Sequence, residues 1–112
     1  MKLILVGSAL AALLVGVDYG PDFKPDARDN GPGSIDVSSY PESMKKAYDM
    51  YAVKCAKCHP LARSVNARFS ATDWKRYMKR VIRRPGSDIS ESQAAQIYDF
   101  LKYYSAQLGI KD

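Results

Sequence analysis

The chain has 112 residues, which is room for one small domain, and a formal net charge of +5. Its two cysteines and single histidine argue against a structural zinc site, which needs further ligands at a set spacing. The charge is uneven, because residues 18–42 carry six acids and two bases whereas residues 43–112 carry fourteen bases and six acids.

Residues 1–17 are typical of an export signal. Lys2 supplies a positive start, and Leu3 to Val17 form an apolar stretch rich in Leu, Val and Ala. The stretch is long enough for the hydrophobic region of a signal peptide and short for a membrane span. We favour a cleaved signal peptide; an uncleaved N-terminal anchor and a buried core helix are the alternatives. Export would place the protein in the periplasm, with membrane association if the anchor is kept.

Residues 18–42 have the composition of a linker. Four prolines and three glycines interrupt any helix, and the segment has no apolar periodicity. Such a segment is extended and mobile unless it lies across the surface of the domain. Behind an N-terminal anchor it would act as a tether.

A first helix is expected from about Ser43 to Cys55, with Ser43 as a candidate N-cap after Pro41. Its apolar side chains recur at helical spacing and share one face: Met44, Ala47, Tyr48, Tyr51 and Ala52.

The run from Cys55 to His59 matches the C-x-x-C-H pattern of haem attachment. In that chemistry two thiols form thioether bonds to the haem vinyl groups, and the adjacent histidine binds the iron. Two cysteines three residues apart lie on one face of a helical turn, which suits the two vinyl positions. The motif predicts one haem c, attached through Cys55 and Cys58 and bound by His59. A thioredoxin-like dithiol would need a βαβ context, which the sequence does not indicate.

Two further helices are expected after the motif. The second begins at Thr72 or Asp73, both good N-caps, and ends near Arg83, before Pro85-Gly86. Its apolar face comprises Trp74, Met78, Val81 and Ile82.

The third helix is expected to open at Ser90, with Gln93 completing a capping box. Its apolar stripe comprises Ala94, Ile97, Tyr98, Leu101, Tyr104 and Leu108. No segment alternates convincingly as a strand. The expected fold is therefore all-α, with about three helices of residues 43–112 around one haem.

With this layout, residues 43–112 resemble a class I c-type cytochrome. The chain is similar to the small monohaem periplasmic cytochromes and to the cytochrome modules fused to bacterial oxidoreductases. The resemblance rests on the haem motif and on a helix before it, a middle helix and an aromatic C-terminal helix. It implies a cytochrome c-like fold in which the first and last helices cross. The chain lacks the later Gly-Pro whose carbonyl often orients the ligand histidine, so a different carbonyl must orient His59.

The segment from Trp74 through Met78 to Pro85-Gly86-Ser87 and Ile89 resembles the distal part of some bacterial members. In those proteins a tryptophan-led helix presents a methionine to the iron, about one turn further on, where this chain has Val81. Met78 lies three residues earlier on the same helix face.

Met78 is the expected second iron ligand, because it is the only methionine after the haem motif and no second histidine exists. Met44 and Met50 precede the motif and are poorly placed. The alternatives are a core role for Met78, ligation by Lys79 or a tyrosine, a five-coordinate iron, or a ligand from a partner subunit.

Two other residues are candidates for haem contacts. Arg63 would pair with a haem propionate or remain a solvated loop residue. Trp74 would donate its indole N–H to a propionate or only pack on the ring. The six bases from Lys75 to Arg84 would form a docking surface for an acidic redox partner or a solvated helix face.

These features predict a one-electron carrier between exported or membrane-bound redox partners, neither an enzyme nor a nucleic-acid-binding protein. One alternative is a haem subunit docked permanently in a larger redox or photosynthetic complex. Another is a haem enzyme or gas sensor with an open iron site. A methionine ligand would fill the sixth position and exclude small molecules, so the ligand separates these hypotheses.

Overall fold

The computed structural model describes residues 18–112, and every regular element in this range is helical. The elements are η1 (Ala27–Asn30), α1 (Glu42–Cys55), α2 (Ala62–Val65), α3 (Ala71–Val81) and α4 (Glu91–Gln107). The expected all-α class is therefore confirmed for the described part of the chain. The expected signal or anchor segment, residues 1–17, lies outside it.

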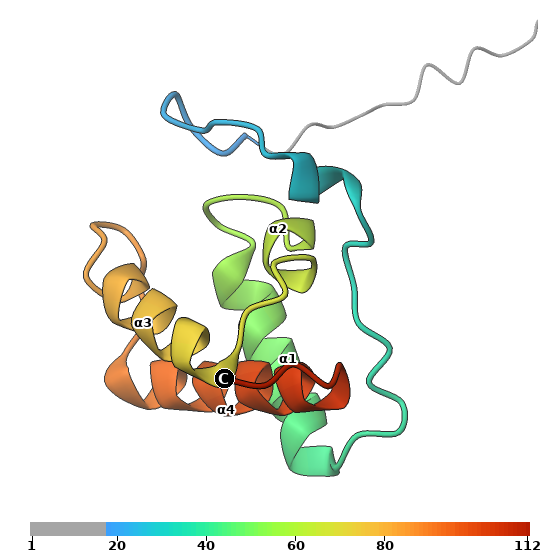
Figure 1. The fold of residues 1–112 in the computed structure, drawn as a ribbon. Helices are drawn as coiled ribbons and strands as arrows, with labels where there is room; N and C mark the ends of the chain where they lie inside the picture. The colour runs from blue at the N-terminus through green and yellow to red at the C-terminus, as the bar shows by residue number, and fades with distance from the viewer. Residues whose placement is uncertain (1–17) are drawn as a thin grey trace, which may run out of the picture.

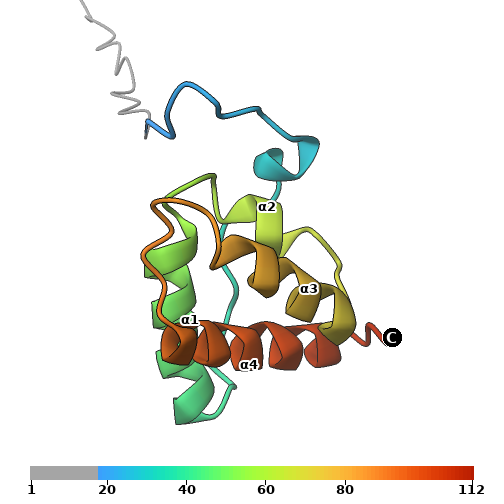
Figure 2. The same cartoon turned by 90° about the vertical axis from the view of Figure 1, so that its left-hand side faces the viewer.

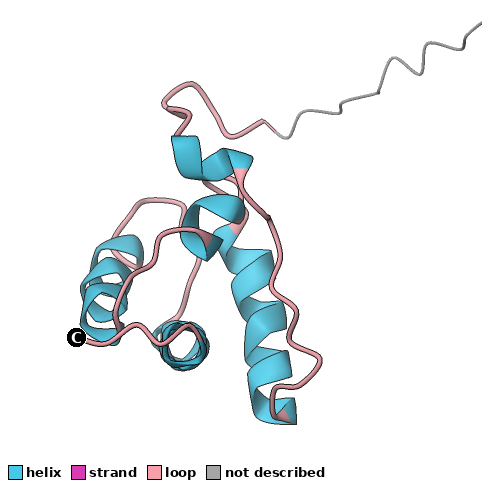
Figure 3. Ribbon diagram, turned by 45° about the vertical axis from the view of Figure 1, so that its right-hand side comes forward, coloured by secondary structure: helices cyan, strands magenta, loops and turns pink. Residues whose placement is uncertain are grey.

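α4 is the helix on which the other two long helices pack. Both α1 and α3 contact it (Figure 1), and α3 lies over it in the second view (Figure 2). In Figure 3 α4 is seen end-on while α1 is seen along its length, so the two helices cross steeply. The largest fully buried side chains come from these three helices: Trp74, Tyr51, Phe100, Ile97 and Leu101.

Phe100 is the centre of an aromatic core that the sequence pattern did not predict. Its ring centroid lies 5.3 Å from those of both Tyr48 and Tyr51 on α1. Leu108, expected on the buried stripe, instead caps the end of α4 and is 40% exposed. The buried arc of α4 is wider than one stripe because two helices and Tyr40 cover it.

The start of α4 was predicted correctly. Ser90 Oγ accepts a hydrogen bond from the Gln93 amide at 3.1 Å, and Gln93 Oε1 accepts one from the Ser90 amide at 2.9 Å. These reciprocal bonds satisfy two amides that the helix itself leaves without acceptors. Gly86, with φ of +82°, makes the turn that separates α4 from α3.

The starts of α3 and α1 differ from expectation. α3 begins at Ala71, because Ser70 and Asp73 form the capping box; Asp73 is therefore inside the helix rather than at its N-cap. α1 begins at Glu42, directly after Pro41, and no side chain caps it. Ser43 is thus a helical residue, and Pro41 occupies the N-cap position with extended backbone, at ψ of 152°.

Residues 23–41, which we call the strap, lie across the domain and run from α2 to the start of α1 (Figure 1). The expectation that proline and glycine prevent any helix here is wrong for one short turn. Asp26 and Asp29 form a capping box around η1, which supplies acceptors for the local amides. At the other end Tyr40 is buried against Tyr103, with ring centroids 4.8 Å apart. The strap is therefore part of the folded domain.

Candidate functional site

The haem motif lies where α1 ends. Cys55 is the last residue of the helix, and the chain then turns through Cys58 to His59. The two thiols are not joined to one another; Cys55 is half-buried and Cys58 is exposed. The motif thus places one thiol at the edge of the core and the other at the surface.

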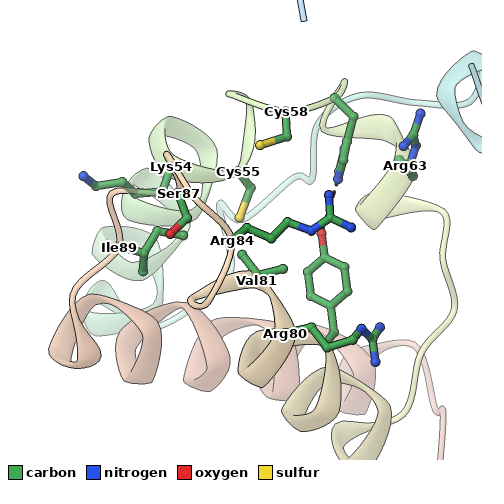
Figure 4. Close-up of a pocket in the computed structure, with 11 residues that line it drawn as sticks. Lys54, Cys55, Cys58, Arg63, Arg80, Val81, Arg84, Ser87 and Ile89 are labelled. Atoms are coloured by element: carbon green, nitrogen blue, oxygen red, sulfur yellow. Dashed lines mark hydrogen bonds between the residues drawn. The ribbon is translucent and has the colours of Figure 1, made fainter. Parts of the chain in front are cut away.

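Both cysteines and His59 line one cavity of about 200 Å³. Across from them stand residues of α3 and of the loop that leads to α4 (Figure 4). The remaining lining residues are Lys54, Arg63, Tyr77, Arg80, Val81, Arg84, Ser87 and Ile89. Four of these side chains are cationic and none is acidic, so the cavity favours an occupant with an apolar body and anionic groups.

The two ring nitrogens of His59 have different partners. Nδ1 lies 3.0 Å from the carbonyl oxygen of Pro60, which can only accept, so Nδ1 carries the proton. Nε2 lies 3.2 Å from the Tyr77 hydroxyl and accepts its hydrogen bond. Burial lowers the pKa of His59 and favours the neutral ring. Pro60 therefore provides the orienting carbonyl and leaves Nε2 as the unprotonated nitrogen, the form a metal ligand requires. The Nε2 lone pair accepts the Tyr77 hydrogen bond, and a metal at Nε2 would replace that bond.

The thiol of Cys55 is unsuited to redox exchange. Burial raises its pKa to about 12, and the neighbouring Cys58 adds a smaller effect in the same direction. A dithiol that attacks disulfides needs a lowered thiol pKa, because the thiolate is the nucleophile. Together with the helical fold of the described residues, this argues against a thioredoxin-like role.

A second cavity, of about 160 Å³, adjoins the first on the other side of His59 and Tyr77. His59 and Tyr77 line the two cavities alike, so the hydrogen bond between these residues lies at the boundary between the cavities. Phe69 and Trp74 give the second cavity an aromatic wall, and Arg28 of the strap borders it. A planar group larger than either cavity would occupy this region by separating Tyr77 from His59.

Arg63 lies at the cavity as expected, but its guanidinium is already bonded. Nε and Nη2 donate to the two carboxylate oxygens of Asp29, at 3.0 and 2.9 Å. Nη2 also donates to the carbonyl of Lys24 at 2.8 Å. Arg63 therefore fastens the strap, and a propionate would have to compete with Asp29 for it.

Trp74 also has a structural partner. Its Nε1 donates to Ser105 Oγ on α4 at 2.9 Å, and the side chain is 1% exposed. Of its two expected roles, packing beside the site fits this position, whereas donation to a propionate does not, since the only N–H is in use.

Met78 is not brought to the cavity. It is 5% exposed and belongs to the hydrophobic core, while Val81 of the same helix lines the cavity. Lys79, another ligand considered from sequence, is exposed and does not line the cavity either.

Sequence reasoning missed the cavity face of α3. Tyr77 and Val81 are four residues apart on α3 and therefore point in one direction, whereas Arg84 reaches the cavity from the turn after the helix. The four-residue spacing is present in the sequence, but the apolar stripe through Trp74 and Met78 indicated the buried face of the helix more strongly. Of the basic residues between 75 and 84, all are exposed, and Arg76 pairs with Asp73 at 3.4 Å.

Over residues 18–112, no three His, Cys, Asp or Glu side chains gather into a metal site of their own. No helix of that range has the length and apolar character needed to cross a membrane. Comparisons with protein-family models, with curated proteins and with solved structures found no match.

Proposed function

We propose that the chain is a monohaem cytochrome of the class I c type that carries single electrons between exported or membrane-bound partners. The observation that carries this proposal is that Cys55, Cys58 and His59 line one cavity, with the His59 ring oriented by the Pro60 carbonyl so that Nε2 is the unprotonated nitrogen. When bound, the haem supplies an iron that changes between Fe(III) and Fe(II).

The residues of the site fit this group. Cys55 and Cys58 would hold the haem through thioether bonds, and His59 would bind the iron with its ring fixed by the Pro60 carbonyl. Val81 and Ile89 offer apolar contact for the ring, and Arg80 and Arg84 offer charge for the propionates. The chain's own part in electron transfer is to hold the haem edge near the surface.

The partner that we propose is a redox protein with an acidic docking surface. Arg80 and Arg84 both line the cavity and are exposed, and the other bases between Lys75 and Arg83 are exposed as well. Opposite charge on a partner would raise the rate of encounter and orient the complex. We propose a periplasmic location, since the haem motif and the expected export signal call for the same compartment.

The test is to produce the full chain in a host that exports and matures c-type cytochromes, then to measure its mass and visible spectrum. We expect the mass to rise by one haem that denaturant does not remove, and a one-electron redox titration. Cys55→Ser and Cys58→Ser should each leave one thioether bond, and the double variant should lose covalent haem. Full-length protein without covalent haem under these conditions would refute the proposal.

A further inference from the structure

Asp88 joins the loop between α3 and α4 to the haem motif. Lys57, which lies between the two cysteines, donates from Nζ to Asp88 Oδ2 at 3.3 Å. Lys54 Nζ lies 3.5 Å from the same oxygen and donates to the Asp88 carbonyl at 2.9 Å. Asp88 has φ of +51°, in the left-handed region that Asp and Asn tolerate better than most residues. One residue thus engages two ammonium groups at the end of α1.

The ion pair of Lys57 with Asp88 lies outside the cavities. Neither residue lines either cavity, and 76% of the Asp88 side chain is exposed. A group held in the cavity therefore need not displace this ion pair. The Lys57 ammonium, helped by Lys54, holds the pKa of the Asp88 carboxyl below its usual range, so the carboxylate is charged at neutral pH.

The cations that line the larger cavity differ in whether a carboxylate compensates them. Lys54 is paired with Asp88, and Arg63 with a carboxylate of the strap. Over residues 18–112, neither Arg80 nor Arg84 has a carboxylate partner. Figure 4 shows Lys54 well away from Arg80. The rim of the cavity is therefore neutralised on the side of the haem motif and cationic on the side of α3.

We propose that Asp88 is a specificity-determining residue, which restricts the docking of an acidic redox partner to the α3 side of the cavity by neutralising Lys54 and Lys57. This inference rests on the proposed function. A negatively charged surface is attracted to uncompensated cations, and the exposed Asp88 carboxylate repels it from the side of the haem motif. The partner would then meet the cavity in one orientation, because only one flank attracts it.

The test locates an acidic probe on the holoprotein. The probe is a hexaglutamate peptide, and a carbodiimide joins its carboxylates to lysine amines as amides that peptide mapping identifies. In the wild type we expect more links at Lys79 of α3 than at Lys57. Asp88→Asn keeps a residue that suits the left-handed backbone and should raise the ratio of Lys57 to Lys79 links roughly threefold at low salt. The control is Asp99→Asn, at an exposed acid of α4, which should leave the ratio unchanged.

Acetic anhydride is the matched reagent, because it is uncharged and reports only how accessible each lysine is. An equal rise in Lys57 acetylation in Asp88→Asn would assign the effect to exposure and refute the inference. Equal linking of Lys57 and Lys79 in the wild type, or an unchanged ratio in Asp88→Asn, would also overturn it. The linking ratio requires no electron transfer. A protein that docks as described but carries no electrons would therefore refute the proposed function and leave this inference standing.

Discussion

Arg63 and Asp29, which are 34 residues apart, meet in a two-point ion pair that joins α2 to η1. The Arg63 side chain also lies against the ring of Phe23, 5.3 Å from its centroid. Because both oxygens of the carboxylate are engaged, the planar guanidinium sets the orientation of the strap as well as its position.

Arg63→Lys should loosen the strap, because an ammonium cannot reproduce the two parallel hydrogen bonds. We expect a protease to cleave residues 18–41 faster in this variant than in the wild type. The matched control is Arg68→Lys, at an exposed arginine of the same region. Equal cleavage of both variants and of the wild type would show that the pair does not hold the strap.

The same pair should make the strap sensitive to acid. The Arg63 guanidinium that donates to Asp29 holds the pKa of that carboxyl below its usual range. The contribution of this ion pair to the free energy of unfolding is therefore complete above the pKa of about 3.9 that the Asp29 carboxyl has in the unfolded chain. It is lost as the pH falls through the lower pKa that the carboxyl has in the folded protein. Asp29→Asn should lose less stability than the wild type over this acid range, measured by urea unfolding. Parallel pH curves would contradict this.

Gly31→Ala should separate the strap from α2. A Cβ at residue 31 would lie 2.4 Å from Asn66 Nδ2, the atom that donates to the Arg28 and Pro32 carbonyls. Displacing the amide should cost about 1 kcal/mol of unfolding free energy for the lost hydrogen bonding. Gly33→Ala is the control, since its Cβ would meet nothing within 4 Å. Identical denaturation midpoints for the two variants would argue against this contact.

The Trp74–Ser105 hydrogen bond should contribute to the packing of α3 on α4. Trp74→Phe removes the donor, and Ser105→Ala removes a hydroxyl that is 2% exposed. Each change should cost about 1–2 kcal/mol in unfolding free energy, apart from any loss of ring packing. The double variant should cost less than the sum, since both changes break the same bond. Strict additivity would mean that the two groups act separately.

The basic face beside the cavity should control the rate of docking. The double variant Arg80→Gln and Arg84→Gln should slow electron transfer to an acidic redox protein at low salt, on the order of tenfold. Lys102→Gln with Lys111→Gln removes the same charge from exposed positions on or after α4 and serves as control. Rates that fall equally in both variants, or do not depend on ionic strength, would exclude a localised docking surface.

Features that depend on residues close together in the sequence, such as helix capping, could be predicted from the sequence. Ser90 and Gln93 mark the start of α4 because their capping bonds join residues three apart. The strap was harder to predict, since its main fastening joins Asp29 to Arg63 across 34 residues. The positions of Tyr77 and Met78 depend on the rotation of α3, which a contact with α4 fixes; no pattern within α3 contains that information.

The strap also limits how far the domain would move from an N-terminal attachment. Its first contacts with the body of the domain are those of Phe23 and Lys24 with Arg63. Residues 18–22 span at most roughly 17 Å when fully extended. Were the N-terminus held at a membrane surface, the cavity would stay within a short radius of that surface. Partners would then have to approach the cavity from the side, along the membrane surface, and the domain would not search freely for them.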